Sequence, residues 1–271
     1  MKKYIILLSC VIIFFSCEEV VDIDLKEGKK ELVVEASIDW IQGTNGAVQT
    51  IVLSQTSAYF EDEYPKVSGA TVRVKDTDNE VYIFKEEDKG VYICRTFQPE
   101  YEKVYQLNIE YQGITYRSID TLRSKVKFDK IIQNDDGGIT KEDKEVEFYF
   151  SNEDTASPQY FLIEARDPYN VIPFYFLLDG DDFQDGKYFV VGGSEDWKSG
   201  DELEFKVYHI SQNYFNYMSR LLAVAEQYGG KPLTTPDARV QGNIINTLDS
   251  KANPLGAFRV TSCLEKKIII E

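Results

Sequence analysis

Hydrophobic and polar residues alternate along much of the chain with a period of two, the spacing of a strand that buries one face. Residues 70–76 (ATVRVKD) and 80–86 (EVYIFKE) show this alternation most clearly. Turn-forming sequences such as DTDN, EDKG and YQG separate the alternating segments. Residues 30–124 hold six or seven such segments and no helical pattern. They therefore predict an N-terminal β-sandwich of immunoglobulin-like type.

A second β-rich set follows in residues 125–271, with strands expected near 126–132 and 145–151. One α-helix is predicted over residues 212–228, capped by Ser211 and ended by Gly229. Its apolar residues have the spacing of a single buried face: Tyr214, Phe215, Met218, Leu221, Leu222 and Ala225. We interpret this face as packed on the protein's own sheet, the alternative being a stripe that binds a partner. The predicted fold is thus mainly β, with two β-sandwich-like domains, the second carrying one helix.

The first sixteen residues have the pattern of a secretory signal. Lys2 and Lys3 precede an apolar run from Tyr4 to Phe15, which is too short to span a bilayer. Two cysteines could follow the cleavage site, in LLSC and FFSC. Cleavage before Cys10 would leave an apolar core of about six residues, below the usual length. We therefore predict a signal peptide over 1–16, a lipidated Cys17, and an acidic tether over 17–29.

The net negative charge argues against nucleic acid and anionic lipid surfaces as partners. The chain has a formal net charge of −16, with 43% hydrophobic and 13% aromatic residues. An acidic chain lacks the basic surface that nucleic acid requires, and it does not adsorb to anionic lipid by charge. Attachment to a membrane would therefore depend on the lipid. Cys94 and Cys263 would remain in an oxidising compartment, and we interpret them as separate buried thiols, with a disulfide as the alternative.

Seven stretches in a fixed order resemble a known family. They are CEEVVDIDL, ELVVEASI, VSGATVRVKD, GVYICRT, YQLNIEYQGITYRS, VQGNIIN and NPLGAFRVTS. Their order is similar to that of a Bacteroidota lipoprotein family, number 4249 among the domains of unknown function, and spans nearly all of the chain after Cys17. The resemblance implies an outer-membrane lipoprotein, often encoded near a TonB-dependent receptor, and it implies no known activity.

Two further expectations depend on that resemblance. Acids directly after the lipidated cysteine resemble a signal for display on the cell surface, and Glu18 and Glu19 fit it; the alternative is that they only solvate the tether. Bacteria of this group also glycosylate triplets of Asp, then Ser or Thr, then an apolar residue. Thr121 and Thr155 lie in such triplets, although the pattern arises easily by chance.

Few residues point to chemistry. His209 is the only histidine and lies on a predicted strand, which favours a structural role and excludes a multi-histidine zinc site. The acidic segment LDGDDFQDG offers hard oxygens for calcium from Asp179, Asp181, Asp182 and Asp185. It lacks the bidentate glutamate of an EF-hand, so an acidic turn between strands is the alternative. Calcium is the one candidate cofactor, and otherwise none is expected.

The leading functional hypothesis is a non-enzymatic, surface-exposed lipoprotein of the outer membrane that assists a TonB-dependent β-barrel transporter. The second is a module that binds glycans or peptides through loop aromatics, and a hydrolase is a remote third. The aromatic candidates are Tyr59, Phe60, Tyr64, Tyr169 and Trp197.

A calorimetric titration tests the calcium hypothesis directly. If the carboxylates of residues 179–185 form a site, millimolar calcium should produce heat of binding that is lost in the double variant Asp179→Asn, Asp181→Asn. A titration that produces no heat would exclude calcium.

Overall fold

The computed structural model describes residues 30–57, 64–138, 141, 143–152, 158–183, 185–225 and 239–271. The fold is mainly β, as predicted, and the described residues contain one α-helix. The strands up to residue 121 are β1 (Leu32–Ile41), β2 (Gln49–Gln55), β3 (Thr71–Asp76), β4 (Val81–Asp88), β5 (Val91–Cys94), β6 (Val104–Tyr111) and β7 (Ile114–Thr121). The later elements are β8 (Val126–Gly137), β9 (Asp143–Asn152), β10 (Tyr160–Arg166), β11 (Phe174–Asp179), η2 (Gly180–Asp182), β12 (Lys187–Ser194), β13 (Glu202–Ile210), α2 (Gln212–Val224), β14 (Ile245–Asn246), η3 (Ser250–Ala252) and β15 (Leu255–Ile269).

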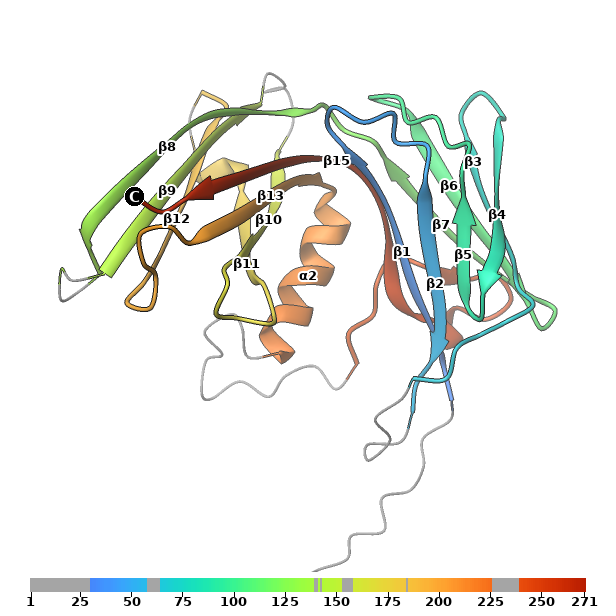
Figure 1. Ribbon diagram of the computed structural model, residues 1–271. Helices are drawn as coiled ribbons and strands as arrows, with labels where there is room; N and C mark the ends of the chain where they lie inside the picture. The colour runs from blue at the N-terminus through green and yellow to red at the C-terminus, as the bar shows by residue number, and fades with distance from the viewer. Residues whose placement is uncertain are drawn as a thin grey trace, which may run out of the picture.

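The described strands form two sheets (Figure 1). The larger has twelve strands in the order β11-β10-β13-β15-β1-β2-β5-β4-β3-β6-β7-β14, and the smaller has the order β12-β9-β8. Strands β1 to β7, β14 and the first half of β15 curve around one core, and we call this part the N-terminal lobe. Strands β8 to β13, helix α2 and the second half of β15 make the C-terminal lobe, in which the small sheet packs over one face of the large one.

Strand β15 belongs to both lobes and joins them. From Leu255 to Cys263 it pairs in parallel with β1, and from Cys263 to Ile269 it pairs antiparallel with β13. Figure 1 shows it as the long red strand that runs from one lobe to the other. The division into domains at residues 124 and 125 stays a prediction. Along the chain β15 falls in the second predicted domain, yet it completes the sheet of the first.

The alternating pattern places apolar side chains in each core. In β1 the buried residues are Leu32, Val34, Ala36 and Ile38, which pack in the core of the N-terminal lobe together with Phe258 and Val260 of β15. The core of the C-terminal lobe is rich in aromatic rings, and Phe148 of β9 stacks on Phe205 of β13 at 4.9 Å between ring centroids. This stack joins the small sheet to the large one.

Strand β10 is buried on both faces, so it shows no alternation of burial. Phe161 and Ile163 point into the core between the two sheets, whereas Tyr160 and Leu162 face helix α2. The sequence YFLIE is therefore a continuous buried run, as expected for a strand covered on both sides.

Helix α2 begins where the sequence predicts. The Tyr214 amide donates to the Ser211 hydroxyl at 3.3 Å, which confirms the predicted cap. Tyr214, Met218 and Leu222 form the buried face, and the helix contacts β10, β11 and β15. The apolar face thus packs on the protein's own sheet, and helix α2 ends at Val224 instead of residue 228. Among the described residues, no helix combines the length and the apolar character that crossing a membrane requires.

An ion pair between a buried arginine and a partly buried aspartate lies where the lobes meet. The Arg259 guanidinium of β15 donates to both carboxylate oxygens of Asp39 on β1, at 3.0 and 2.7 Å. It also donates to the Tyr214 hydroxyl at 3.2 Å and lies 4.4 Å from the centre of the Tyr208 ring. Burial opposes the charge, but the Asp39 carboxylate outweighs this and raises the pKa of Arg259. One guanidinium therefore links β1, β13, β15 and the first turn of α2.

The ion pair yields a prediction about stability. Asp39→Ala leaves Arg259 charged, buried and without its carboxylate, so we expect the free energy of unfolding to fall by about 3 kcal/mol. Glu202→Ala is the matched control, because Glu202 and Lys267 form an ion pair in which both side chains are more than half exposed. That change should cost less than about 1 kcal/mol. Urea unfolding measures both, and equal losses would contradict the assignment.

Candidate functional site

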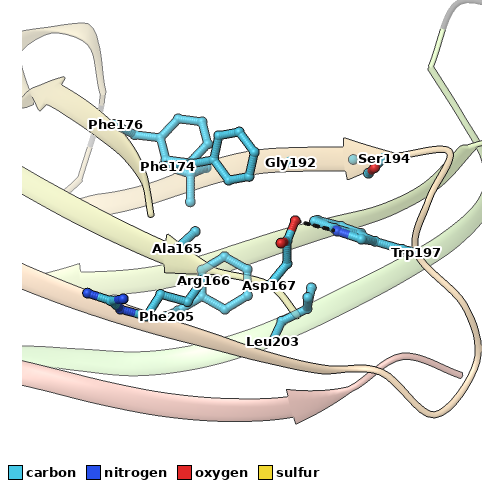
Figure 2. Close-up of a pocket in the computed structure, with 12 residues that line it drawn as sticks. Ala165, Arg166, Asp167, Phe174, Phe176, Gly192, Ser194, Trp197, Leu203 and Phe205 are labelled. Carbon is cyan, nitrogen blue, oxygen red and sulfur yellow. Dashed lines mark hydrogen bonds between the residues drawn. The ribbon is translucent and has the colours of Figure 1, made fainter. Parts of the chain in front are cut away.

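An apolar pocket opens at one end of the C-terminal lobe. It has a volume of about 130 Å³ and lies between the last residues of β12 and the first residues of β11 (Figure 2). Its lining residues are Ala165, Arg166, Asp167, Phe174, Phe176, Val190, Gly192, Gly193, Ser194, Trp197, Leu203 and Phe205. Figure 2 shows the Phe174 and Phe176 rings on one side, with the paired side chains of Trp197 and Asp167 on the other.

Asp167 organises the polar side of the pocket. It accepts a hydrogen bond from Trp197 Nε1 at 3.0 Å and others from the backbone amides of Tyr169 and Asn170 at 3.0 and 2.8 Å. Burial of the carboxyl opposes its ionisation, but these donors outweigh burial and hold the pKa of Asp167 below its ordinary value. The ionised carboxylate thus fixes both the Trp197 ring and the turn that follows β10.

The loop that joins the lining residues Asp167 and Phe174, which we call the mouth of the pocket, exposes apolar side chains. The loop after Asp167 presents Val171, which is 95% exposed, and Ile172, which is 62% exposed, and Phe174 begins β11 at 47% exposed. Tyr169 donates its hydroxyl hydrogen to Asp201 at 2.8 Å, and the Lys198 ammonium lies 6.0 Å from its ring centre. Contiguous exposed apolar side chains beside a pocket indicate a binding surface.

Two open sheet edges flank the pocket. Among the described strands, β11 ends the large sheet and β12 ends the small one. The inner face of β12 carries no side chain at Gly192, where an added Cβ would meet only Trp197 and Phe176, at 3.8 and 3.9 Å. A glycine inside a strand often marks a place where a ligand or another backbone comes close.

A family comparison covers most of the chain. The family model described as "Domain of unknown function (DUF4249)" matches residues 18–267. The chain belongs to this family. No curated protein matches it. Membership in the DUF4249 family brings no assigned activity.

The structure brings two of the five predicted ligand-binding aromatics together in this DUF4249 protein. Trp197 lines the pocket and donates to Asp167, and the backbone amide of Tyr169 donates to the same carboxylate, although the Tyr169 side chain does not line the pocket. Trp197 is only 9% exposed, so it forms a wall and presents no open face. Tyr64 is exposed but belongs to the N-terminal lobe, beside β2. Tyr59 and Phe60 lie outside the described residues.

Sequence reasoning did not find the other lining residues. Among the lining residues that the sequence analysis does not identify are Phe174, Phe176, Gly192 and Gly193. The available signal was a glycine pair inside a strand that is otherwise rich in β-branched and aromatic residues, which indicates a close approach by a ligand or another backbone.

The predicted calcium segment forms a turn. Asp179 Oδ1 accepts a hydrogen bond from the Asp181 amide at 3.1 Å and thereby caps the short helix η2. Asp181 and Asp185 line a polar cavity of about 530 Å³ together with Gln159 and Tyr188. In the part of the chain that the structure describes, no three His, Cys, Asp or Glu side chains converge as metal ligands. Nothing is described of the Asp182 side chain, and calcium stays a prediction.

The other candidate residues are placed as follows. The sole histidine, His209, is buried, and its Nδ1 lies 2.9 Å from the Ser124 carbonyl oxygen and 3.3 Å from Asn152 Nδ2. Cys94 and Cys263 are separate buried thiols, as interpreted, and burial raises the pKa of Cys263 to about 12. Thr121 ends β7, and its triplet neighbours Asp120 and Leu122 are buried. Cys17, Glu18, Glu19 and Thr155 lie outside the described residues.

The Asp167–Trp197 hydrogen bond yields the second prediction. Trp197→Phe removes a donor to a carboxylate and should lower the free energy of unfolding by about 2 kcal/mol at pH 7. Tyr169→Phe is the control, because it removes an exposed hydroxyl and should change stability by less than about 0.5 kcal/mol.

The pH dependence of the Trp197→Phe effect separates the hydrogen bond from loss of packing. The folded-state pKa of Asp167 is lowered, so its contribution is present above its unfolded pKa of about 3.9 and is lost as the pH falls through the folded value. The stability difference between wild type and Trp197→Phe should therefore shrink below pH 4. A difference that does not change with pH would show that the loss comes from packing alone.

Proposed function

We propose that this DUF4249 protein is a non-enzymatic binding protein, held at the bacterial outer membrane by a lipid on Cys17, that assists a TonB-dependent transporter. The observation that carries the proposal is the position of the pocket relative to the start of β1. These two features lie at opposite ends of β15.

The register of β15 supports this placement. Its first residue, Leu255, pairs with Val33 at the start of β1, and Ile269 pairs with Glu202, next to Leu203 of the pocket. At 3.3 Å per residue these two positions are separated by roughly 45 Å along the strand. A lipid on Cys17, fifteen residues before Leu32, would thus attach the protein near one end of β15 and leave the pocket at the other.

The chemistry of the pocket supports binding over catalysis. Its walls are apolar, and among its described lining residues Asp167 is the one acid. Both oxygens of that carboxylate already accept hydrogen bonds from the protein. A glycosidase would need a second carboxyl across the bond to be cleaved.

Sequence features, and not the structure, support the parts of the proposal that concern the outer membrane and the transporter. The basic start, the short apolar run and the FFSC motif support export and lipidation. The family match begins at residue 18, directly after Cys17, which supports cleavage there. The transporter rests on the resemblance to Bacteroidota lipoproteins encoded beside such receptors, and Glu18 and Glu19 support an outward orientation.

A glycan- or peptide-binding module is the second candidate. The pocket and its exposed apolar mouth favour it, and it is compatible with the first because an accessory protein can bind the cargo or a segment of the transporter.

The two cysteines provide a matched test of the anchor. Cys17→Ser should abolish incorporation of radiolabelled palmitate and release the protein from the membrane fraction. Cys10→Ser should leave both unchanged, because residue 10 would be removed with the signal peptide. Labelling that depends on Cys10 would contradict the predicted cleavage site.

Co-purification tests the partner. When membranes of the native host are solubilised in mild detergent, the tagged protein should retain a TonB-dependent β-barrel that is absent when the tag is carried by an unrelated outer-membrane lipoprotein. Repeated isolation without any β-barrel would overturn the accessory role and leave the anchor untouched.

A further inference from the structure

We propose that the pocket receives one apolar or aromatic side chain of an extended, basic peptide segment, which adds as a strand to the open edge of β12. This deepens the proposed function by naming the ligand class, and it rests on that proposal only in treating the chain as a binding protein. Four observations carry it: the size of the pocket, the open edge, Gly192 and the charge at the mouth.

The size of the pocket fits a single side chain. A dry cavity of about 150 Å³ lined by Leu, Ile and Phe side chains binds benzene, so about 130 Å³ accommodates a phenyl or branched aliphatic group. The walls formed by Phe174, Phe176 and Leu203 match such a group, and Asp167 is engaged with Trp197. The pocket therefore selects an apolar group and is too small to enclose an oligosaccharide.

The buried position of Trp197 also favours a side chain over a sugar. Sugars stack on the flat, exposed face of an aromatic ring. Trp197 is 9% exposed and has its indole nitrogen bound to Asp167, so it presents a wall instead of a platform. Tyr169 has one face near Lys198 and its hydroxyl bound to Asp201.

The edge of β12 at residues 191–194 supplies the backbone partner. An edge strand offers unpaired amides and carbonyls along one side, and peptides commonly bind by adding a strand there. Gly192 has its Cα hydrogens toward Trp197 and Phe176. Residues directly opposite one another in paired strands point to the same face of the sheet. The peptide residue opposite Gly192 would therefore direct its side chain into the space that glycine leaves.

Charge selects the flanking residues of the peptide. Asp167, Asp196 and Asp201 all raise the pKa of the Tyr169 hydroxyl at the mouth, with the hydrogen bond to Asp201 as the largest cause. Nearby cations neutralise the negative charge of these carboxylates only in part, because the Arg166 guanidinium is already paired with Glu164 at 2.7 Å. The two segments next to the pocket, residues 166–172 and 195–202, together carry five acids and two basic residues. A segment with Lys or Arg beside its apolar residue complements this field.

The test uses the complete chain, purified as the cell produces it, and a blocked synthetic peptide of sequence Lys-Thr-Thr-Phe-Thr-Thr-Lys. We expect this peptide to bind at least about tenfold more tightly than the same peptide with a central Ala, because a benzyl group leaves water. Replacing both terminal Lys residues by Glu should also weaken binding, and added salt should reduce the difference between the two peptides.

Two variants locate the peptide. Gly192→Leu fills the pocket and should abolish the preference for Phe over Ala. Gly192→Ala adds a single methyl group at ordinary contact distance and should reduce the preference while leaving thermal unfolding nearly unchanged. Val191→Leu is the matched control, because Val191 lies on the outer face of the same strand and is 41% exposed. It should bind as wild type does.

Hydrogen exchange tests the strand addition separately. Bound peptide should slow amide exchange within residues 191–194, and a pocket filled without strand pairing would not. Three outcomes would each overturn the inference. The first is that no peptide binds at millimolar concentration, and the second is that Gly192→Leu and Gly192→Ala leave binding unchanged. The third is that maltohexaose displaces the peptide. No transporter is present in the assay, so a protein that binds peptide yet retains no β-barrel contradicts only the accessory role. A protein that retains a β-barrel but binds no peptide contradicts only this inference.

Discussion

The sharing of β15 between β1 and β13 is the constraint on which the rest of the structure depends. Its residues enter all three apolar clusters: Phe258 and Val260 in the N-terminal lobe, Leu264 and Ile268 between the two sheets, and Ala257 and Cys263 beneath α2. Without this strand the large sheet would be divided between β13 and β1, because β15 is the strand that pairs with both. Since Asp39 and Arg259 are 220 positions apart, the decisive pairing forms between the two ends of the described chain. Contacts of such long range slow folding, because a long loop must close before they stabilise anything.

The Arg259–Asp39 pair belongs to the same constraint. A guanidinium costs free energy to bury, and apolar residues of similar size often serve stability as well. At this position, however, it binds three elements that approach from different directions: Asp39 from β1, Tyr214 from α2, and the ring of Tyr208 from β13. Directed hydrogen bonds restrict the angle between elements in a way that apolar packing does not. The ion pair therefore helps to hold the two lobes, and thus the pocket and the start of β1, at opposite ends of β15.

The sequence predicted what is local and missed what is not. Alternation in residues 70–76 identified β3, and Ser211 with its apolar spacing identified α2, because strand period and helix capping act within a few residues. The partner of β15 could not be predicted, because a period of two says which face is buried and not which strand lies alongside. The site shows the same division. Tyr169 and Trp197 were recognised as loop aromatics, but Asp167, which joins them, looked like an ordinary turn residue. Asp179, predicted as a calcium ligand from its acidic neighbours, also caps the short helix η2, and calcium binding there stays a prediction.

Strands β11 and β12 each lie at the edge of a sheet among the described strands. They follow one another along the chain yet end different sheets, so the crossing between the sheets leaves both exposed among the described strands. Exposed edges invite pairing between copies of a protein, and charge is one of the ways to prevent this. Here the acids at the mouth of the pocket, within a chain of net charge −16, make the approach of a second copy unfavourable. The same negative charge attracts a strand that carries basic residues. Protection against self-association and selection of a partner can thus both follow from one set of carboxylates.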